Sequence, residues 1–284
     1  STSTNGNGEL RFHIFFVNFR ILFVYFLCLN FQVHAKVDTL KVKSDAMNRL
    51  VPNLIILPNS PHDESLPVIY LLHGAGGDFS NWMRRAPFIE DLAEELGVII
   101  VCPDGGKQGW YLDSPVLPES QYETFIVSEL IPSVDSLYQT IATSNSRAIT
   151  GLSMGGHGAL YLAFRHPKLF DSAGSMSGGV DLRPFPENWG IPKLLGRIED
   201  FPERWAEHSV VEIAKSVSTL SRFIFDCGLS DFFLDVNRDL DRVMTERGIS
   251  HSYIEREGTH NWDYWRVSVV EHLRFFAARF AGDI

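Results

Sequence analysis

Apolar runs without polar alternation recur along this chain, and stretches of helical spacing separate them. The run 67–72 (PVIYLL) is the clearest of them, and a loop rich in glycine, 73–77 (HGAGG), follows it directly. Strands that are apolar on both sides occur in parallel sheets, whose two faces are covered by helices. The alternation therefore predicts an α/β fold with one mostly parallel, doubly wound sheet in a single domain.

The expected elements cover most of the chain. Strands are expected at 37–42, 50–57, 67–72, 98–101, 147–150, 170–176, 222–227 and 250–256, and helices at 81–96, 124–138, 155–165, 232–247 and 263–280. Pro132 is expected to kink the second of these helices. The segment 179–219, with four prolines and two tryptophans, breaks the alternation. We expect an insertion of short helices and loops there, either a small lid or a plain surface excursion.

The first 35 residues have the features of a secretory signal peptide. The apolar run 21–31 is too short to span a bilayer comfortably, and Arg11 and Arg20 lie on its N-terminal side. Val33-His34-Ala35 ends the segment in the small-residue pattern of a cleavage site. We therefore expect a catalytic domain at 36–284 that is secreted or periplasmic and has no stable membrane insertion after cleavage. An uncleaved anchor is the alternative.

Composition excludes several classes of function. Lys and Arg number 25 against 35 Asp and Glu, so the formal net charge is −10, and an acidic surface repels nucleic acid. Three cysteines are too few for a disulfide scaffold, and they have no zinc-site spacing. Cys102 and Cys227 are expected to be unpaired and buried.

The sequence Gly151-Leu152-Ser153-Met154-Gly155 matches the G-x-S-x-G motif and lies between an expected strand and an expected helix. In that position the sharp turn presents the serine hydroxyl above the sheet. We therefore predict Ser153 as a nucleophile. The amide of Met154 lies at a helix N-terminus, where it can donate a hydrogen bond to a developing oxyanion.

A serine nucleophile needs a base and an acid, which follow it along the chain in this motif's usual setting. Six histidines follow Ser153: His157, His166, His208, His251, His260 and His272. Only His260 is expected in a loop just past a strand, and it is the predicted base. Asp226 and Asp231 compete as the acid, and the loop position favours Asp231, although that residue could instead cap the helix that follows.

The glycine-rich loop after the third expected strand supplies the second oxyanion donor. The N–H of Ala75 is the first choice, with Gly74 or Gly76 as alternatives. The loop is not a dinucleotide-binding fingerprint, because Phe79 stands where the third glycine would be. The chain has no P-loop and no H-E-x-x-H motif, so neither a cofactor nor a metal is predicted.

These motifs, in this order, resemble the putative-esterase branch of the α/β-hydrolases, which includes esterase D-like enzymes, feruloyl and acetyl xylan esterases, and tributyrin esterases. The matching pieces are YLLHG at 70–74, PDG at 103–105, GLSMGG at 151–156, CGLSD at 227–231 and GTHNW at 258–262. The resemblance implies an α/β-hydrolase fold with Ser153, Asp231 and His260 as a triad and the Ala75 and Met154 amides as an oxyanion hole. It also implies a two-step acyl transfer from an ester to water.

Several aromatic residues are expected near this site. Trp110 and Tyr111 follow the fourth expected strand and Trp262 lies beside His260, where they could stack on sugar or phenolic rings or simply pack the core. With export, this favours an esterase that removes feruloyl or acetyl groups from plant cell-wall polysaccharides. The alternative is a broad short-chain acyl esterase. An acyltransferase and a catalytically silent binding protein are the weaker readings, and the oligomeric state stays open.

Overall fold

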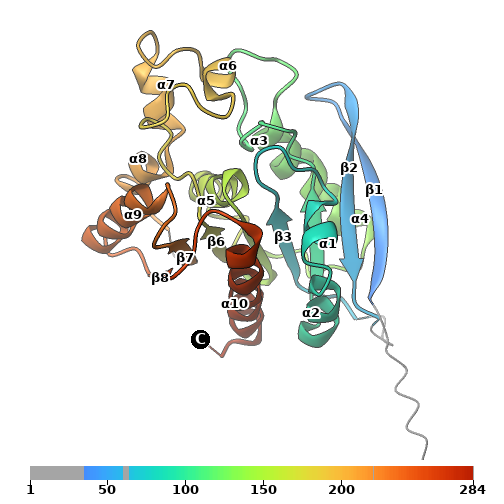
Figure 1. Ribbon diagram of the computed structural model, residues 1–284. Coiled ribbons are helices and arrows are strands. Elements are labelled where there is room, and N and C mark those ends of the chain that lie inside the picture. Colours follow the sequence, from blue (N-terminus) through green and yellow to red (C-terminus); the bar gives the residue numbers. More distant parts are fainter. Residues whose placement is uncertain (1–34, 60–63, 220, 284) are drawn as a thin grey trace, which may run out of the picture. The chain divides into compact units, whose positions relative to one another are not determined.

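The sheet is mostly parallel and eight-stranded in the part of the chain that the structure describes (Figure 1). The structure is a computed structural model, and it describes residues 35–59, 64–219 and 221–283. These residues belong to one compact unit, 33–284. The signal-peptide prediction for 1–35 concerns residues that lie, except for Ala35, outside the described ones. The strands are β1 (Lys36–Ser44), β2 (Arg49–Leu57), β3 (Val68–Leu72), β4 (Ile99–Pro103), β5 (Arg147–Gly151), β6 (Ser172–Met176), β7 (Arg222–Gly228) and β8 (His251–Arg256).

The strand order is β1-β2-β4-β3-β5-β6-β7-β8, and only the pairs β1–β2 and β2–β4 are antiparallel. Tyr70 of β3 lies opposite Val101 of β4 on one side and Ile149 of β5 on the other. The chain changes direction across the sheet at β3, because β4 is added on one side of it and β5 on the other. The loops after β3 and β5 therefore meet at the carboxyl edge, where α/β sheets bind their ligands.

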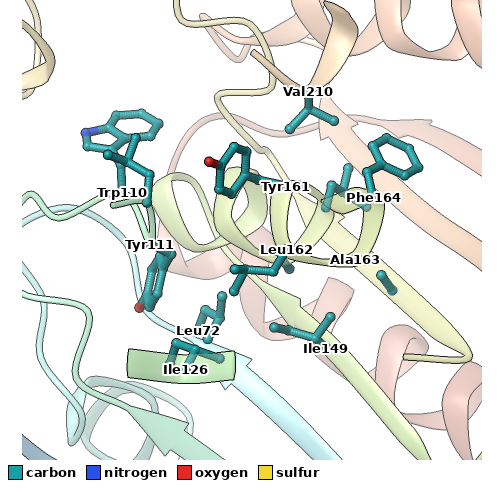
Figure 2. Close-up of a cluster of buried hydrophobic side chains, with 14 of the residues drawn as sticks. Leu72, Trp110, Tyr111, Ile126, Ile149, Tyr161, Leu162, Ala163, Phe164 and Val210 are labelled. Carbon is teal, nitrogen blue, oxygen red and sulfur yellow. The ribbon is translucent and has the colours of Figure 1, made fainter. Parts of the chain in front are cut away.

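Helices cover both faces of the sheet. They are α1 (Asn81–Arg85), α2 (Ile89–Leu96), α3 (Tyr122–Thr124), the π-helix η1 (Phe125–Leu130), α4 (Ile131–Leu137), the 3₁₀-helix η2 (Ser144–Ser146), α5 (Met154–Arg165), α6 (Ile191–Leu195), α7 (Pro202–Glu207), α8 (Val210–Ala214), α9 (Leu234–Glu246) and α10 (Trp262–Ala281). Ile69 and Leu71 of β3 pack in the core cluster shared with α1, α2 and α10, whereas Tyr70 and Leu72 pack in the one shared with η1, α5 and α9. Figure 2 shows part of this second cluster. Successive residues of β3 thus face opposite helix layers, which explains its continuous apolar run.

The predicted α/β-hydrolase fold is confirmed, and two predicted helices need correction. The helix expected at 81–96 is two helices, because Pro87 interrupts it between α1 and α2. The helix expected at 124–138 does not simply kink at Pro132. Since proline has no N–H to donate to the preceding turn, that turn widens into the π-helix η1.

The segment between β6 and β7 contains the short helices α6, α7 and α8, in the region where an insertion of short helices and loops is predicted (179–219). Ile191, Trp205 and Val210 are buried in the core cluster that includes α5. The insertion is therefore packed onto the body of the sheet. Cys102 and Cys227 are buried, and neither forms a disulfide. No helix within the described ranges is both long enough and apolar enough to cross a bilayer.

Candidate active site

Ser153 occupies the turn between β5 and α5, with φ +54° and ψ −116°. This is a strained conformation for a residue with a side chain, and such strain is concentrated at functional sites. The flanking glycines are required by space. A Cβ on Gly155 would lie 2.6 Å from the Leu72 carbonyl oxygen, and one on Gly151 would lie 2.7 Å from the Gly155 oxygen. The G-x-S-x-G sequence thus allows the turn that exposes the serine hydroxyl.

The structure brings Ser153, His260 and Asp231 together in one hydrogen-bonded array. His260 Nε2 lies 2.9 Å from Ser153 Oγ, and His260 Nδ1 lies 2.9 Å from Asp231 Oδ2. A carboxylate can only accept, so Nδ1 carries the imidazole proton and Nε2 is left to accept the serine proton. The arrangement can therefore generate an alkoxide nucleophile at Ser153.

Asp231 has two partners, and neither is a helical N–H of α9, so it does not cap that helix. Its carboxylate is inaccessible to solvent and contacts His260, and its Oδ1 also accepts a hydrogen bond of 2.9 Å from the N–H of Phe233, just before α9. The other candidate acid, Asp226, is 2.8 Å from His272 Nε2 and 2.8 Å from Ser268 Oγ. Only Asp231 of the two contacts His260.

The loop after β3 lies against the elbow. A Cβ on Gly74 would be 3.3 Å from Ser153 Cβ, so the backbone of this loop approaches the serine closely. In the described part of the chain, the N–H groups of Ala75 and Met154 donate to no other protein group. The Gly76 N–H donates to the Lys107 carbonyl at 2.7 Å, which removes Gly76 from the candidate oxyanion donors.

Two of the three aromatic residues expected at the substrate surface are elsewhere. Trp110 and Tyr111 are 1% and 0% exposed and belong to the core beside α5 (Figure 2). Their burial supports the other expectation, that they pack the core: both side chains turn inward from a loop whose backbone has positive φ. Trp262 is half-buried and packs edge-on against Trp82 and Trp265.

A different aromatic group borders His260. The ring of Phe232, which is 53% exposed, lies 4.2 Å from the imidazole, and Trp189 of the insertion stacks on Phe232 at 5.6 Å. The signal in the sequence is the Phe232-Phe233 pair directly after the candidate acid. Within the described residues, no three His, Cys, Asp or Glu side chains are grouped to hold a metal ion.

Comparisons with known proteins place the whole described domain beside esterases. The model of a family described as putative esterase matches residues 44–276. An acetyl esterase of Caldicellulosiruptor saccharolyticus is 27% identical over 236 residues, covering 75% of this chain and 84% of that protein. An S-formylglutathione hydrolase of Paracoccus denitrificans is 25% identical, covering 79% and 87%. A solved ferulic acid esterase has a TM-score of 0.75 at 29% identity, covering 87% of this chain and 99% of its own. The family match includes both the elbow and the His260 loop.

Proposed function

This chain belongs to the putative esterase family and is a carboxylic ester hydrolase, and we propose that Ser153, His260 and Asp231 are its catalytic triad. The observation that carries the proposal is the 2.9 Å contact between Ser153 Oγ and His260 Nε2 at a strained strand-to-helix turn. His260 takes the serine proton as Oγ attacks the ester carbonyl. Asp231 fixes the imidazole tautomer and stabilises the imidazolium that forms.

The negative charge that develops on the carbonyl oxygen is stabilised by the N–H groups of Met154 and Ala75. The alcohol leaves with the proton from His260, and an acyl group stays on Ser153. Water then attacks the acyl-serine with His260 as base, which releases the acid and restores the hydroxyl. Each half of the reaction uses the same three side chains and the same two amides.

The substrates that we propose are feruloyl or acetyl esters of plant cell-wall polysaccharides. Phe232 and Trp189 offer an aromatic surface beside His260, and a phenolic acyl group stacks well on such a surface. The acetyl esterase relative supports acetyl as the second acyl group. Export fits a polymeric substrate, and the signal-like pattern of 1–35 supports it; N-terminal sequencing of exported protein would then start at Lys36. The alternative is a broad short-chain acyl esterase.

The test is hydrolysis of methyl ferulate, p-nitrophenyl acetate and p-nitrophenyl butyrate by the wild type and by Ser153→Ala. We expect the variant to lose about 10³-fold or more in kcat/KM on every ester. Ser177→Ala is the matched control, because Ser177 also has positive φ (+48°) and its buried hydroxyl has no hydrogen-bond partner among the described residues. An active Ser153→Ala would exclude Ser153 as nucleophile.

Acyl preference is tested with Phe232→Ala. Loss of the aromatic surface should lower kcat/KM for methyl ferulate by about 3- to 10-fold, the equivalent of one aromatic contact, and leave p-nitrophenyl acetate nearly unchanged. A wild type that prefers butyrate, with equal effects of the variant on all esters, would favour the broad short-chain esterase instead.

A further inference from the structure

The hydroxyl of Tyr111 is bonded to the backbone of the loop that follows β3. Tyr111 Oη accepts a hydrogen bond of 3.0 Å from the His73 N–H and donates one of 3.1 Å to the His73 carbonyl. A phenol can do both at once, since it has one proton and two lone pairs. This single hydroxyl therefore fixes both backbone polar groups of the residue that begins the loop, one position before Gly74.

The His73 side chain holds the same loop at a second point. The Gly105 N–H donates to His73 Nε2 at 2.9 Å, so Nε2 is the unprotonated nitrogen. Nδ1 then carries the proton and donates to the Gly74 carbonyl at 2.8 Å. Burial lowers the pKa of His73, which keeps the imidazole in this neutral tautomer.

The Tyr111 ring reaches this position at a cost in backbone energy. Trp110 and Tyr111 have φ of +51° and +56°, and left-handed backbone costs about 1–2 kcal/mol for each residue with a side chain. The ring occupies a slot that only glycines leave open: a Cβ on Gly105 would lie 2.3 Å from the Tyr111 ring, and one on Gly158 would lie 2.6 Å from Tyr111 Cβ. Strain of this kind persists where the surrounding structure enforces it.

We propose that Tyr111, together with His73, is a positioning residue that holds the 73–77 loop so that the Ala75 N–H faces the carbonyl under attack at Ser153. The inference rests on the proposed function, because the loop has a catalytic use only if Ser153 is the nucleophile. Oxyanion donors stabilise the transition state only if they are fixed in advance. Releasing the loop should therefore lower kcat and leave ground-state binding, and so KM, nearly unchanged.

The first test is Tyr111→Phe, which keeps the ring and removes the hydroxyl. We expect kcat to fall by about 10- to 100-fold with KM within about twofold. The Ki of a trifluoromethyl ketone, which forms an oxyanion on the serine, should rise by the same factor as kcat/KM falls. Tyr70→Phe is the matched control, since Tyr70 is fully buried in β3 and, in the described part of the chain, no hydrogen bond joins its hydroxyl to the 73–77 loop. Active-site titration with a fluorophosphonate normalises kcat to folded enzyme.

The second test uses His73 and covers the case in which Tyr111→Phe fails to fold. His73→Gln can still donate to Gly74 and accept from Gly105, so it should retain most of kcat, whereas His73→Leu should lose it as Tyr111→Phe does. If Tyr111→Phe has the kcat and the ketone Ki of the wild type, the inference is overturned, provided that Ser153→Ala is inactive. If Tyr111→Phe is unfolded, the same result for His73→Leu overturns it. An active Ser153→Ala would instead remove the proposed function, and this inference with it.

Discussion

At the scale of single residues, position relative to the end of β7 decides which aspartate is hydrogen-bonded to His260. Asp226 lies within β7 and is buried with His272 and Ser268, whereas Asp231 lies three residues past the end of β7, where its carboxylate reaches His260. Both carboxylates contact an imidazole. They differ in what the imidazole contacts next: His260 reaches Ser153, and His272 Nδ1 lies 2.8 Å from the hydroxyl of Thr150.

Substitution of the two acids should separate catalysis from stability. Asp231→Asn should leave the geometry nearly intact but favour the wrong tautomer of His260, so we expect kcat to fall by about 10³- to 10⁴-fold. Asp226→Asn should leave kcat per folded molecule within a few-fold and lower the free energy of unfolding by about 3 kcal/mol, because it disrupts a fully buried pair. Ester hydrolysis and urea denaturation of both variants check this. The reverse pattern would assign the acid to Asp226.

At the scale of secondary-structure elements, one carboxylate joins the short helix α3 to the helix that follows the elbow. Glu123 accepts from Tyr161 Oη at 2.9 Å and from Arg165 Nε at 2.8 Å, and His166 Nε2 is 2.7 Å away. Burial alone would raise the pKa of Glu123, but the hydrogen bonds from His166, Arg165 and Tyr161 outweigh it and lower the pKa to about 2. The ionised form therefore stabilises the contact between α3 and α5.

This predicts a pH-dependent stability effect of Glu123→Gln. The folded pKa lies below the ordinary value of 4.5, so the contribution of Glu123 is complete above pH 4.5 and is lost as the pH falls toward 2. We expect the variant to lose about 2 kcal/mol of unfolding free energy at pH 7 and almost nothing near pH 2. Glu95→Gln, at an exposed ion pair, should change little at either pH. Urea denaturation measures both, and an equal loss at the two pH values would contradict the assignment.

Elements and site residues differ in how far they could be predicted. The order of strands and helices followed from apolar runs, and the positions of Ser153 and His260 followed from loops at strand ends. The burial of Tyr111 could not be predicted, because it depends on a slot left by Gly105 and Gly158, which are far from each other in the sequence. The burial of Trp110 depends on packing against Gly179 and Trp189 of the insertion. The antiparallel addition of β2 to β4 is likewise set by tertiary pairing. Local patterns therefore predict elements, and side-chain exposure requires their packing.

At the scale of the whole molecule, buried histidines make the folded state sensitive to acid. His157 is fully buried under the insertion, where its Nε2 donates to the His208 carbonyl at 2.8 Å. Burial lowers the pKa of His157 to about 4, and it also lowers the pKa of His73. In the unfolded chain both imidazoles titrate near 6.5, so the unfolded state takes up protons that the folded state does not.

The free energy of unfolding should accordingly fall as the pH is lowered from 6.5 to 4. His157 alone should account for about 3 kcal/mol of this loss, since its folded pKa is about 4 against an ordinary 6.5. Urea denaturation at pH 7 and pH 4.5 measures the effect. In His157→Gln the free energy of unfolding should depend less steeply on pH, because up to one fewer proton is taken up on unfolding. An unchanged slope of unfolding free energy against pH would show that other groups cause the acid sensitivity.

The hydrogen bond between Ser153 and His260 joins positions 107 residues apart in the chain. A ribosome needs roughly 5 to 20 s to add that many residues. Throughout that interval the emerging polypeptide carries Ser153 without the base that we propose for it, so the proposed acyl transfer cannot run. The activity that we propose therefore starts only once position 260 has been synthesised and has folded against the turn that holds Ser153. For a protein that is exported before it folds, the activity would start only at its destination.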